Sequence, residues 1–427
     1  MTDDGMKLLV FAHTPPPHHG QSYMVQLLLD GFGGDCRRGG RPSPHGIECY
    51  HVNARFSKHL EDIGNFRLTK LILLLEYCLA AIFVRFRHGV RNFYYVPAPG
   101  KKSALWRDWL VMALCRPFFT RIILHWHAAG LAKWLETEQR ISVRALTYRL
   151  MKSVDLSIVL SRYNLLDAEK LLARQVRVIG NGIPDPCPGY EQEIWPRRQA
   201  RAAARSKLLA GKQLTAADRQ QTGEDPQLLR VLFLAHCTRE KGLFDTLEAV
   251  ALANARLAAI RSPVRVHLTV AGSFLSPLEQ LEFEQRITQS DLQLSPGTGV
   301  VTSSSPSQSC VCYVGFVTGS EKHRTFTQSD CFCFPTYYYA ESFGLVILEA
   351  MAYGLPIVAS RWRSIPELLP PDFPGLVPPC NPAAVATALV DLATTPSTDT
   401  LRTHFLEHYS LEQYLNNLAT AIRALET

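Results

Sequence analysis

The sequence lacks an apolar run long enough to span a bilayer. The strongest segment of this kind, LILLLEYCLAAIFV at residues 71–84, is interrupted by Glu76 and falls short of the roughly 20 apolar residues that a spanning helix needs. We therefore expect a buried or interfacial helix there. The first residues, MTDDGMKLLVFA, open on acidic side chains and differ from the basic and then apolar pattern of a signal peptide.

Motifs for metal and nucleic-acid binding are also missing. There is no zinc-finger spacing and no aromatic RNA-binding motif, which argues against nucleic acid as a partner. The pairs Cys310/Cys312 and Cys331/Cys333 are C-x-C, and their alternation with Val or Phe favours packing in strands over zinc ligation. No Asp-x-Asp occurs, so the usual carboxylate pair for a nucleotide-bound divalent cation is absent and a metal-independent reaction is favoured.

The charge is unevenly distributed along the 427 residues, whose formal net charge is +7. Residues 1–190 contain 25 Lys and Arg against 15 Asp and Glu, whereas residues 231–427 contain 12 against 18. This contrast favours two domains with different tasks, the first facing an anionic partner such as a membrane surface or a phosphorylated lipid, although drift in composition is an alternative. The 11 cysteines, without an export signal, predict reduced thiols and a cytoplasmic location.

Short apolar strands alternate with helix-like segments, which predicts an α/β fold with parallel sheets. The strand–loop–helix plan occurs once in each half of the chain, on either side of a polar region rich in Ala, Arg and Gln. We predict an N-terminal domain at 1–189, an interdomain region at 190–229, a second domain at 230–405 and a C-terminal helix at 406–427 that packs back on the first domain. A Ser- and Gly-rich insert at 295–309 is predicted to be a mobile surface loop.

Ligands of doubly wound sheets bind where strands lead into helix N-termini, which selects four loops. The first contains Gly20, which lacks the Cβ that would keep a phosphate from the backbone. The second, HWHAAG, places His127 directly after an apolar strand, where it is either structural or an exposed loop group. The third, TREKGLFD, carries Arg239 and Lys241 before a helix. These cations either form a solvated cluster or bind a diphosphate.

The fourth loop, ESFGLVILEAMAYGLP, predicts a helix from an N-cap at Ser342 to about Tyr353, ended by Gly354 and Pro356. Glu341 precedes this helix, and Glu349 lies about two turns inside it among apolar residues. A buried carboxylate needs hydrogen-bond donors. They are either ligand hydroxyls or a salt bridge or backbone amide, and the helix alone leaves both open.

These loops, in this order, resemble glycosyltransferase family 4, the retaining nucleotide-sugar-dependent enzymes with the GT-B fold. The strongest match runs from Tyr313 to Leu369 and includes the E-x7-E pair Glu341 and Glu349. VLFLAHCTREKGLFDTLEAV, RVIGNGIPD and the stretch from VPAPGKK to HWHAAG resemble further family segments, the last as in the bacterial polysaccharide branches. The resemblance covers most of the chain outside 190–229 and 275–310, and it implies two Rossmann-like doubly wound domains facing across a cleft.

The resemblance also implies residue roles. Glu349 would bind the ribose hydroxyls, Glu341 would lie near the sugar, and the amides of Phe343, Gly344 and Leu345 would hold the sugar and phosphates. Lys241 would neutralise the diphosphate, helped by amides of the Gly20 loop, and His127 would contact the transferred sugar. His236 stands where the family usually has an Arg, so Arg239, or His236 if protonated, would take its place. The loop before Glu367 also departs from the family pattern, because a common Gly is missing from RWRSIPEL.

We therefore expect a retaining, metal-independent glycosyltransferase that needs no cofactor beyond its nucleotide-diphosphate sugar donor. Its acceptor would be a polysaccharide, an oligosaccharide or a lipid-linked molecule at the inner face of the membrane. The alternatives are a nucleotide-sugar epimerase or hydrolase of the same fold, and a non-catalytic partner in polysaccharide assembly.

Overall fold

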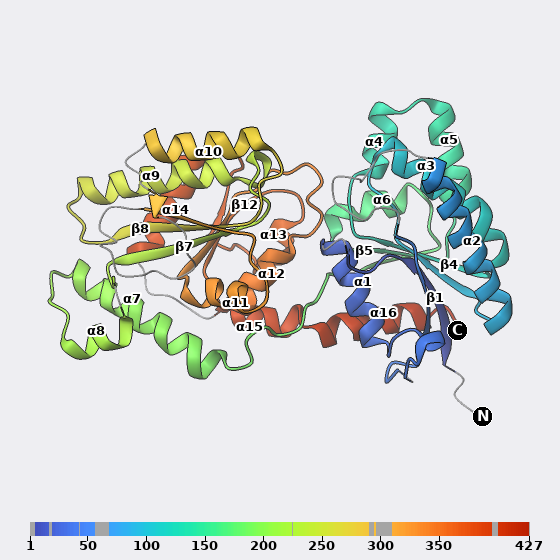
Figure 1. Ribbon diagram of the computed structural model, residues 1–427, viewed down its shortest axis with the longest axis horizontal. Coiled ribbons are helices and arrows are strands. Elements are labelled where there is room, and N and C mark those ends of the chain that lie inside the picture. Colours follow the sequence, from blue (N-terminus) through green and yellow to red (C-terminus); the bar gives the residue numbers. More distant parts are fainter. Residues whose placement is uncertain are drawn as a thin grey trace. The chain divides into compact units, whose positions relative to one another are not determined.

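A computed structural model describes residues 5–16, 19–41, 43–55, 68–223, 225–289, 294–295, 310–394 and 400–426. The chain forms two compact units, coloured by sequence in Figure 1. Unit 1 comprises residues 1–184, 340–343 and 409–427, and unit 2 comprises residues 185–339 and 344–408. Each unit has its own parallel sheet with helices packed on it, so the predicted α/β fold with two Rossmann-like, doubly wound domains is confirmed.

Unit 1 is built on a six-stranded sheet of order β2-β1-β3-β4-β5-β6. Its strands are β1 (Met6–Ala12), β2 (Ile47–Asn53), β3 (Asn92–Tyr95), β4 (Arg121–Trp126), β5 (Leu156–Val159) and β6 (Gln175–Val178). Its helices are α1 (Gly20–Gly31), α2 (Leu68–His88), α3 (Lys102–Cys115), α4 (Leu131–Glu138), α5 (Ile141–Met151), α6 (Leu165–Glu169) and α16 (Leu411–Arg423), with short 3-10 turns η1 (Cys36–Arg38), η3 (Arg116–Phe118) and η4 (Arg162–Asn164).

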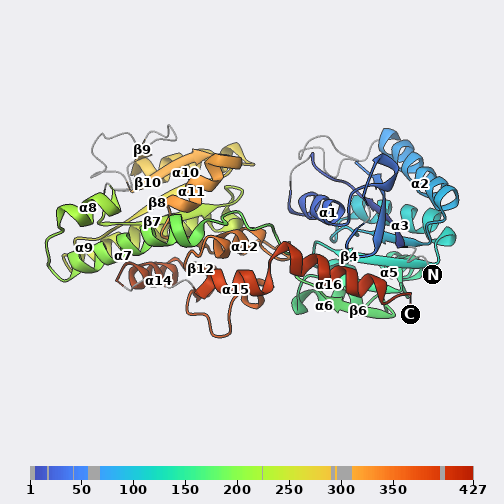
Figure 2. The same ribbon diagram turned by 90° about the horizontal axis from the view of Figure 1, so that it is seen from below.

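The strand order of unit 1 reverses between β1 and β3. The chain moves from β1 outward to β2, and then returns past β1 to β3. Because crossover connections are right-handed, α1 covers one face of the sheet, and α2 and α3 cover the other. Figure 2 shows α16 beside the sheet of unit 1, and α16 packs against α1. The carboxyl ends of β1 and β3 therefore form a switch point of the kind at which open sheets bind ligands.

Unit 2 has a seven-stranded parallel sheet of order β13-β12-β11-β7-β8-β10-β9. Its strands are β7 (Leu228–Leu234), β8 (Arg265–Ala271), β9 (Leu294–Ser295), β10 (Val311–Gly315), β11 (Cys331–Phe334), β12 (Ile357–Ser360) and β13 (Leu376–Val377). Its helices are α7 (Trp195–Leu209), α8 (Ala216–Thr222), α9 (Leu243–Ala259), α10 (Pro277–Gln289), α11 (Gly319–Gln328), α12 (Leu345–Ala352), α13 (Ile365–Leu368), α14 (Pro382–Thr394) and α15 (Thr400–His408), with short turns η5 (Tyr190–Ile194) and η6 (Arg239–Lys241). The switch point of this sheet lies between β7 and β11.

Each sheet is buried by apolar residues from its own unit. In β7 and β11, Val231, Phe233 and Cys331 are almost fully buried in one cluster, as expected for parallel strands covered on both faces. Cys333 belongs to the same cluster, which is the packing role that its alternation with Phe predicted.

Residues 190–229 do not form a separate interdomain region, because they belong to unit 2. Helix α7 is fixed by buried arginines: Arg201 and Arg205 form ion pairs with Asp330, at 2.6 and 2.9 Å. Arg198 donates to the carbonyl oxygen of Tyr353 at 2.6 Å. The low apolar content of residues 190–229 suggested a linker. The segment nevertheless packs against the rest of unit 2, because its arginines form ion pairs with Asp330 and hydrogen bonds with backbone carbonyl oxygens.

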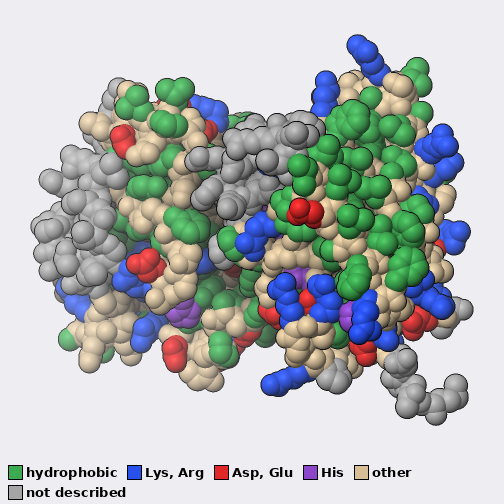
Figure 3. Space-filling model, turned by 45° about the vertical axis from the view of Figure 1, so that its right-hand side comes forward, with side chains coloured by type: hydrophobic (Ala, Val, Ile, Leu, Met, Phe, Trp, Pro, Cys, Tyr) green, Lys and Arg blue, Asp and Glu red, His purple; other side chains and the backbone are tan. Residues whose placement is uncertain are grey.

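The segment around residues 71–84 is helical, within α2. No helix among the residues that the structure describes is long and apolar enough to cross a membrane. One side of α2 is buried in unit 1, whereas the other exposes large apolar side chains, and hydrophobic groups gather over this part of the surface in Figure 3. The helix is thus amphipathic with an apolar outer side.

The C-terminal residues from Tyr409 lie in unit 1, where the sequence placed the final helix. Their attachment is a parallel bridge in which the amide of Ile183 donates to the carbonyl of Tyr409 at 3.0 Å, and the amide of Leu411 donates to Ile183 at 2.9 Å. Of the predicted mobile insert, Ser295 ends β9, and residues 296–309 lie outside the described residues.

Candidate functional site

Lys241 lies at the switch point of unit 2, in the loop that follows β7. Its Nζ is 4.5 Å from the centroid of the Tyr338 ring and 5.7 Å from that of Phe334, both from the end of β11. The indole of Trp362 donates to the carbonyl of Tyr338 at 2.9 Å, which holds this loop against β12. The aromatic faces attract the ammonium group and limit its freedom. A fixed cation at the carboxyl ends of two neighbouring strands can bind an anionic ligand.

The loop of Lys241 is locked to the loop after β11. The amide of Tyr337 donates to the carbonyl of Glu240 at 2.8 Å. Gly242 has φ +84°, and a Cβ at this position would come within 2.5 Å of the carbonyl oxygen of Pro335. Both the left-handed backbone and the close approach require glycine here. The glycine in TREKGLFD therefore brings the two loops together and places Lys241.

His236 lies two residues after the end of β7, and the charge of Lys241 acts on it. Burial, and then the positive charge of Lys241, lower the pKa of His236 below its ordinary value. The imidazole is therefore neutral at pH 7 and does not supply the positive charge expected of a protonated substitute for the family's Arg.

Arg239 is directed toward α10. Its guanidinium contacts the Glu282 carboxylate at 2.5 Å, its amide donates to Glu279 at 2.7 Å, and it lies over the Phe244 ring. Side-chain hydrogen bonding to Glu282 raises the pKa of Arg239. The structure thus pairs Arg239 with carboxylates of α10, whereas His236 is the imidazole on which the charge of Lys241 acts.

Glu349 has a partner for one carboxylate oxygen and none for the other. Lys322, in the first turn of α11 after β10, donates to Oε1 at 2.6 Å. Oε2 is buried and has no hydrogen-bond partner among the described residues. The salt bridge that the sequence left open is therefore present, yet half of the carboxylate's accepting capacity is unused. Such a group can accept hydrogen bonds from ligand hydroxyls.

The helix that carries Glu349 begins later than predicted. Its N-cap is Gly344, with φ +80°, and α12 starts at Leu345. Ser342 is not the N-cap, because its hydroxyl donates to the carbonyl of His127 at 2.7 Å. Within the described chain, the amides of Gly344 and Leu345 have no hydrogen-bond acceptor. They provide donors and a positive helix end for an anion.

The short segment 340–343 belongs to unit 1, although its neighbours in sequence belong to unit 2. Besides the bond from Ser342 to His127, the Asn164 amide donates to the carbonyl of Ser342 at 3.2 Å. Glu341 is buried, with 7% of its surface exposed, and the Phe343 ring packs near Gly180. Glu341 and Phe343 are therefore placed with His127, whereas Gly344, Leu345 and Glu349 are in unit 2.

Histidines line the carboxyl edge of the sheet of unit 1. His127 follows β4, His13 follows β1, and His19 is the N-cap of α1, where its Nδ1 accepts from the amide of Ser22 at 3.4 Å. Gly20 is the first residue of that helix, and the Nε2 atoms of His13 and His19 lie 2.9 Å apart.

These imidazoles are neutral at pH 7. Burial, and then the charge of His19, lower the pKa of His127 to about 3. Burial, with neighbouring cationic groups, lowers that of His13 to about 4. Neutral imidazoles both donate and accept hydrogen bonds, which suits contact with sugar hydroxyls.

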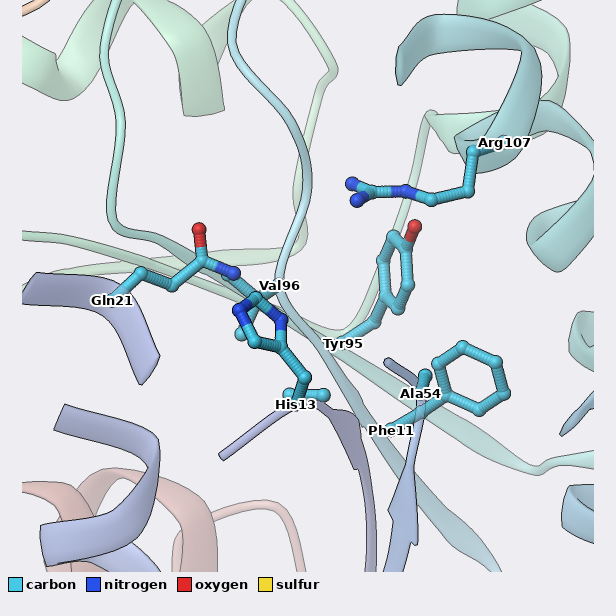
Figure 4. A pocket seen from close by; sticks show the side chains of 8 residues that line it. Phe11, His13, Gln21, Ala54, Tyr95, Val96 and Arg107 are labelled. Carbon is cyan, nitrogen blue, oxygen red and sulfur yellow. The ribbon is translucent and has the colours of Figure 1, made fainter. Parts of the chain in front are cut away.

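A small open pocket lies at the switch point of unit 1. Figure 4 shows His13 and Gln21 at this pocket, and Arg107 pointing toward the hydroxyl of Tyr95. Tyr95 also donates to the buried carboxylate of Asp108 at 2.6 Å. The pocket combines hydrogen-bonding groups with one permanent cation, a lining suited to a polar ligand.

Residues 229–395 match the family described as "Glycosyl transferases group 1". This match covers less than half of the chain. The matched segment contains His236, Lys241, Lys322, Glu349 and both loops of the unit 2 switch point, so the geometry described for unit 2 lies within the part of the chain that is similar to these glycosyltransferases.

Curated relatives match over parts of their length. The amylovoran biosynthesis glycosyltransferase AmsK of Erwinia amylovora is 29% identical over 172 residues, which is 39% of this chain and 36% of the relative. For the sulfoquinovosyl transferase SQD2 of Arabidopsis thaliana, 40% identity extends over 63 residues, or 15% of this chain and 12% of the relative. The matches thus span well under half of the length of these relatives.

The solved structures agree over the whole chain. Sucrose-phosphate synthase from Thermosynechococcus elongatus has a TM-score of 0.62 at 18% identity and covers 99% of both chains. Anabaena HepE in complex with UDP-glucose has a TM-score of 0.61 at 16% identity, covering 98% of this chain and 100% of that one. At this identity the likeness establishes the GT-B fold.

Sequence reasoning missed Lys322, Tyr338 and Arg107. Lys322 comes four residues after Thr318, the N-cap of the helix that follows the strand VCYVG, and Tyr338 lies directly beyond the strand CFCF. The sequence indicates that Lys322 and Tyr338 follow predicted strands. It does not indicate which groups their side chains contact, because those contacts join elements that are distant in sequence.

Proposed function

We propose that the protein transfers a sugar from a nucleoside-diphosphate sugar to a glycan or lipid-linked acceptor. One observation carries this proposal: within the segment that matches the group 1 glycosyltransferases, Lys241 and the incompletely bonded Glu349 belong to loops and helices at the same carboxyl edge of the unit 2 sheet. An ammonium group suits a diphosphate, and a carboxylate with a spare acceptor suits a ribose diol.

In the proposed reaction, the bond between the anomeric carbon and the diphosphate oxygen breaks as the acceptor oxygen binds that carbon. Lys241 stabilises the negative charge that develops on the leaving phosphate. The amides of Gly344 and Leu345 add hydrogen bonds to the same donor. In this proposal the acceptor oxygen approaches on the same face of the sugar ring as the departing diphosphate, which takes the acceptor proton. The anomeric configuration is then retained without a protein nucleophile.

The proposed reaction is metal-independent, because a lysine takes the place of the cation that an Asp-x-Asp pair would hold. In unit 1, the neutral imidazole of His127 and the buried Glu341 remain the groups expected near the transferred sugar, and the pocket near Arg107 can receive a polar group of the acceptor. The first donors to test are UDP-sugars, because HepE, which shares the fold, binds UDP-glucose. A lipid-linked acceptor would bring the protein to a membrane surface.

Binding is tested with UDP and UDP-glucose by calorimetry and thermal shift. We expect Glu349→Gln to weaken binding about 10- to 100-fold, because a neutral amide replaces a charged acceptor of two ribose hydroxyls. The matched control is Glu321→Gln, an exposed carboxylate on α11, which should bind as the native protein does. Undiminished binding by a folded Glu349→Gln variant would contradict the ribose role.

Transfer is tested by assaying radiolabelled UDP-sugars with membrane and glycan extracts as acceptors, with and without EDTA. We expect Lys241→Ala to lower kcat/KM roughly 100-fold or more, and Lys212→Ala, at an exposed lysine between α7 and α8, to leave it unchanged. Activity should survive EDTA, and NMR of the first product should show the donor's anomeric configuration. A Lys241→Ala variant with full activity would refute the proposed leaving-group role.

A further inference from the structure

Helix α2 of unit 1 presents an apolar outer side. Its exposed large side chains follow the helical spacing i, i+3, i+7, i+11, i+14: Ile72, Leu75, Leu79, Phe83 and Phe86. At 3.6 residues per turn these positions form one stripe along the helix. The exposed fractions are 65% for Leu79 and 66% for both phenylalanines. The opposite side, with Leu74, Cys78, Ala81 and Val84, lies in the core of unit 1.

The stripe continues onto neighbouring elements. The rings of Phe86 and Phe118 are 6.0 Å apart, and Arg85 links the two elements by donating to the carbonyl of Phe118 at 2.8 Å. Phe118 is 41% exposed, and Trp106, on α3 beside α2, is 58% exposed. We call these seven apolar residues of α2, α3 and η3 the outer face of unit 1. Soluble proteins commonly expose single apolar side chains, whereas the outer face brings several of them together in one patch, and a patch of this kind often marks an interaction site.

The charges around the outer face are mainly positive. Helices α2, α3 and α5 together contain seven Lys or Arg, of which Arg107 is paired with the buried Asp108, and one exposed acidic residue, Glu76. Arg87, Lys102 and Arg149 are exposed. In Figure 3 the hydrophobic groups of this region are bordered by Lys and Arg. An apolar area with a cationic border is complementary to a surface in which anionic groups lie above an apolar layer.

We propose that the outer face of unit 1 docks onto the surface of an anionic lipid bilayer, with α2 lying in the plane of the interface. The phenylalanines, Leu79 and Trp106 would enter the boundary between headgroups and acyl chains, and the arginines would reach the lipid phosphates. Long cationic side chains can do this while their stems lie along apolar surface. A second copy of the chain fits the face less well, because pairing would bring two cationic borders together.

Docking of this kind rests on the proposed function for its biological purpose. The bilayer would be the partner that presents a lipid-linked acceptor to the protein. The outer face belongs entirely to unit 1 and shares no residue with the donor positions of unit 2. Lipid binding is measured without donor or turnover. A failure of docking is therefore distinguishable from a failure of glycosyl transfer.

The test is flotation of the full-length protein with vesicles of phosphatidylcholine alone or mixed with phosphatidylglycerol, at low and high salt. We expect binding to the mixed vesicles, weakened by salt because the phosphate contacts are screened. The double variant Leu79→Gln/Phe83→Gln should reduce the partition coefficient roughly tenfold or more, because two apolar groups no longer enter the lipid. Both positions are exposed, so the variant should fold, and circular dichroism verifies this.

The matched control is Leu278→Gln/Leu281→Gln on α10 of unit 2, where the two leucines are 78% and 51% exposed. It should float like the native protein. The proposal is overturned if native protein stays out of the lipid fraction at both salt concentrations, or if the control and the α2 variant lose binding equally. It is also overturned if the α2 variant floats normally and instead turns a dimer into a monomer in analytical ultracentrifugation, which would make the face a contact between copies.

Discussion

At the scale of single residues, burial decides which groups carry charge. His127 is 8% exposed and has a pKa near 3, and the carbonyl oxygen of the same residue accepts the Ser342 hydroxyl. The Lys241 ammonium lies over the rings of Tyr338 and Phe334. The sites of the two units therefore differ in kind: neutral hydrogen-bonding groups predominate near His127, and ionic groups predominate near Lys241 and Glu349.

The low pKa of His127 predicts acid sensitivity. In unfolded chains His titrates near 6.5, so between pH 6.5 and about 3 the unfolded state binds a proton that the folded state excludes. The free energy of unfolding should therefore fall as pH decreases through this window, by up to about 1.4 kcal/mol per pH unit for this residue. Above pH 6.5 the contribution is constant.

Urea unfolding of native protein and a His127→Gln variant at pH 7, 6 and 5 checks this. The variant should show a shallower loss of stability with acid, by about one proton. Parallel pH profiles for the two proteins would show that His127 is not protonated on unfolding and would contradict its neutral burial.

At the scale of elements, α7 shows how a polar segment is packed into a unit. Burial alone would raise the pKa of Asp330, but Arg205, Arg201 and Arg230 outweigh it and bring the pKa to about 2. The Asp330 carboxylate thus stays charged in the interior, where it is the counter-ion of Arg201 and Arg205. A buried charge that loses its partner is strongly destabilising.

We expect Asp330→Asn to lower the free energy of unfolding by about 3–5 kcal/mol, because Arg201 and Arg205 would keep their charges without a counter-ion. Urea titration monitored by circular dichroism measures the change. Asp218→Asn, which removes the charge of the partly exposed partner of Lys207 on α8, is the control and should have a much smaller effect. Similar small effects for both variants would mean that the buried network does not fix α7.

The elements also show what the sequence could predict. The strand runs, the loops after them and the motif at 341–349 could be located, because apolar periodicity and Gly and Pro signals are local. The boundary at 190–229 was misjudged, because composition does not record that arginines of α7 find carbonyls and Asp330 in unit 2. The N-cap was misplaced for a similar reason: Ser342 has the right chemistry for a cap, but it bonds to His127, over 200 positions earlier.

At the scale of the whole molecule, unit 1 is built from three pieces of the chain. Its last piece contributes α16, where Leu415 packs on Gly31 and Leu418 is fully buried. The stability of unit 1 therefore depends on residues that follow the whole of unit 2 in sequence.

We expect Leu418→Ala to destabilise unit 1 by about 2–5 kcal/mol, the usual range for a buried leucine. Hydrogen exchange should then become faster in β1 and α1, while protection persists in β7 and β8. The control is Leu406→Ala in unit 2, at a 45% exposed position, which should stay within about 0.5 kcal/mol of the native protein. Faster exchange in unit 2 alone would contradict this assignment of α16.

The same division restricts how parts of unit 1 can be exchanged between related proteins. A chimaera that joins residues 1–184 of one protein to the remainder of another would combine one parent's β1 and α1 with the other's α16, and one parent's His127 with the other's Ser342. Recombination at a single crossover should therefore give poorly folded hybrids. Grafts that move residues 340–343 and 409–427 together with 1–184 keep the three pieces matched, and breakpoints of this kind are the ones to use when chimaeras of this protein are built.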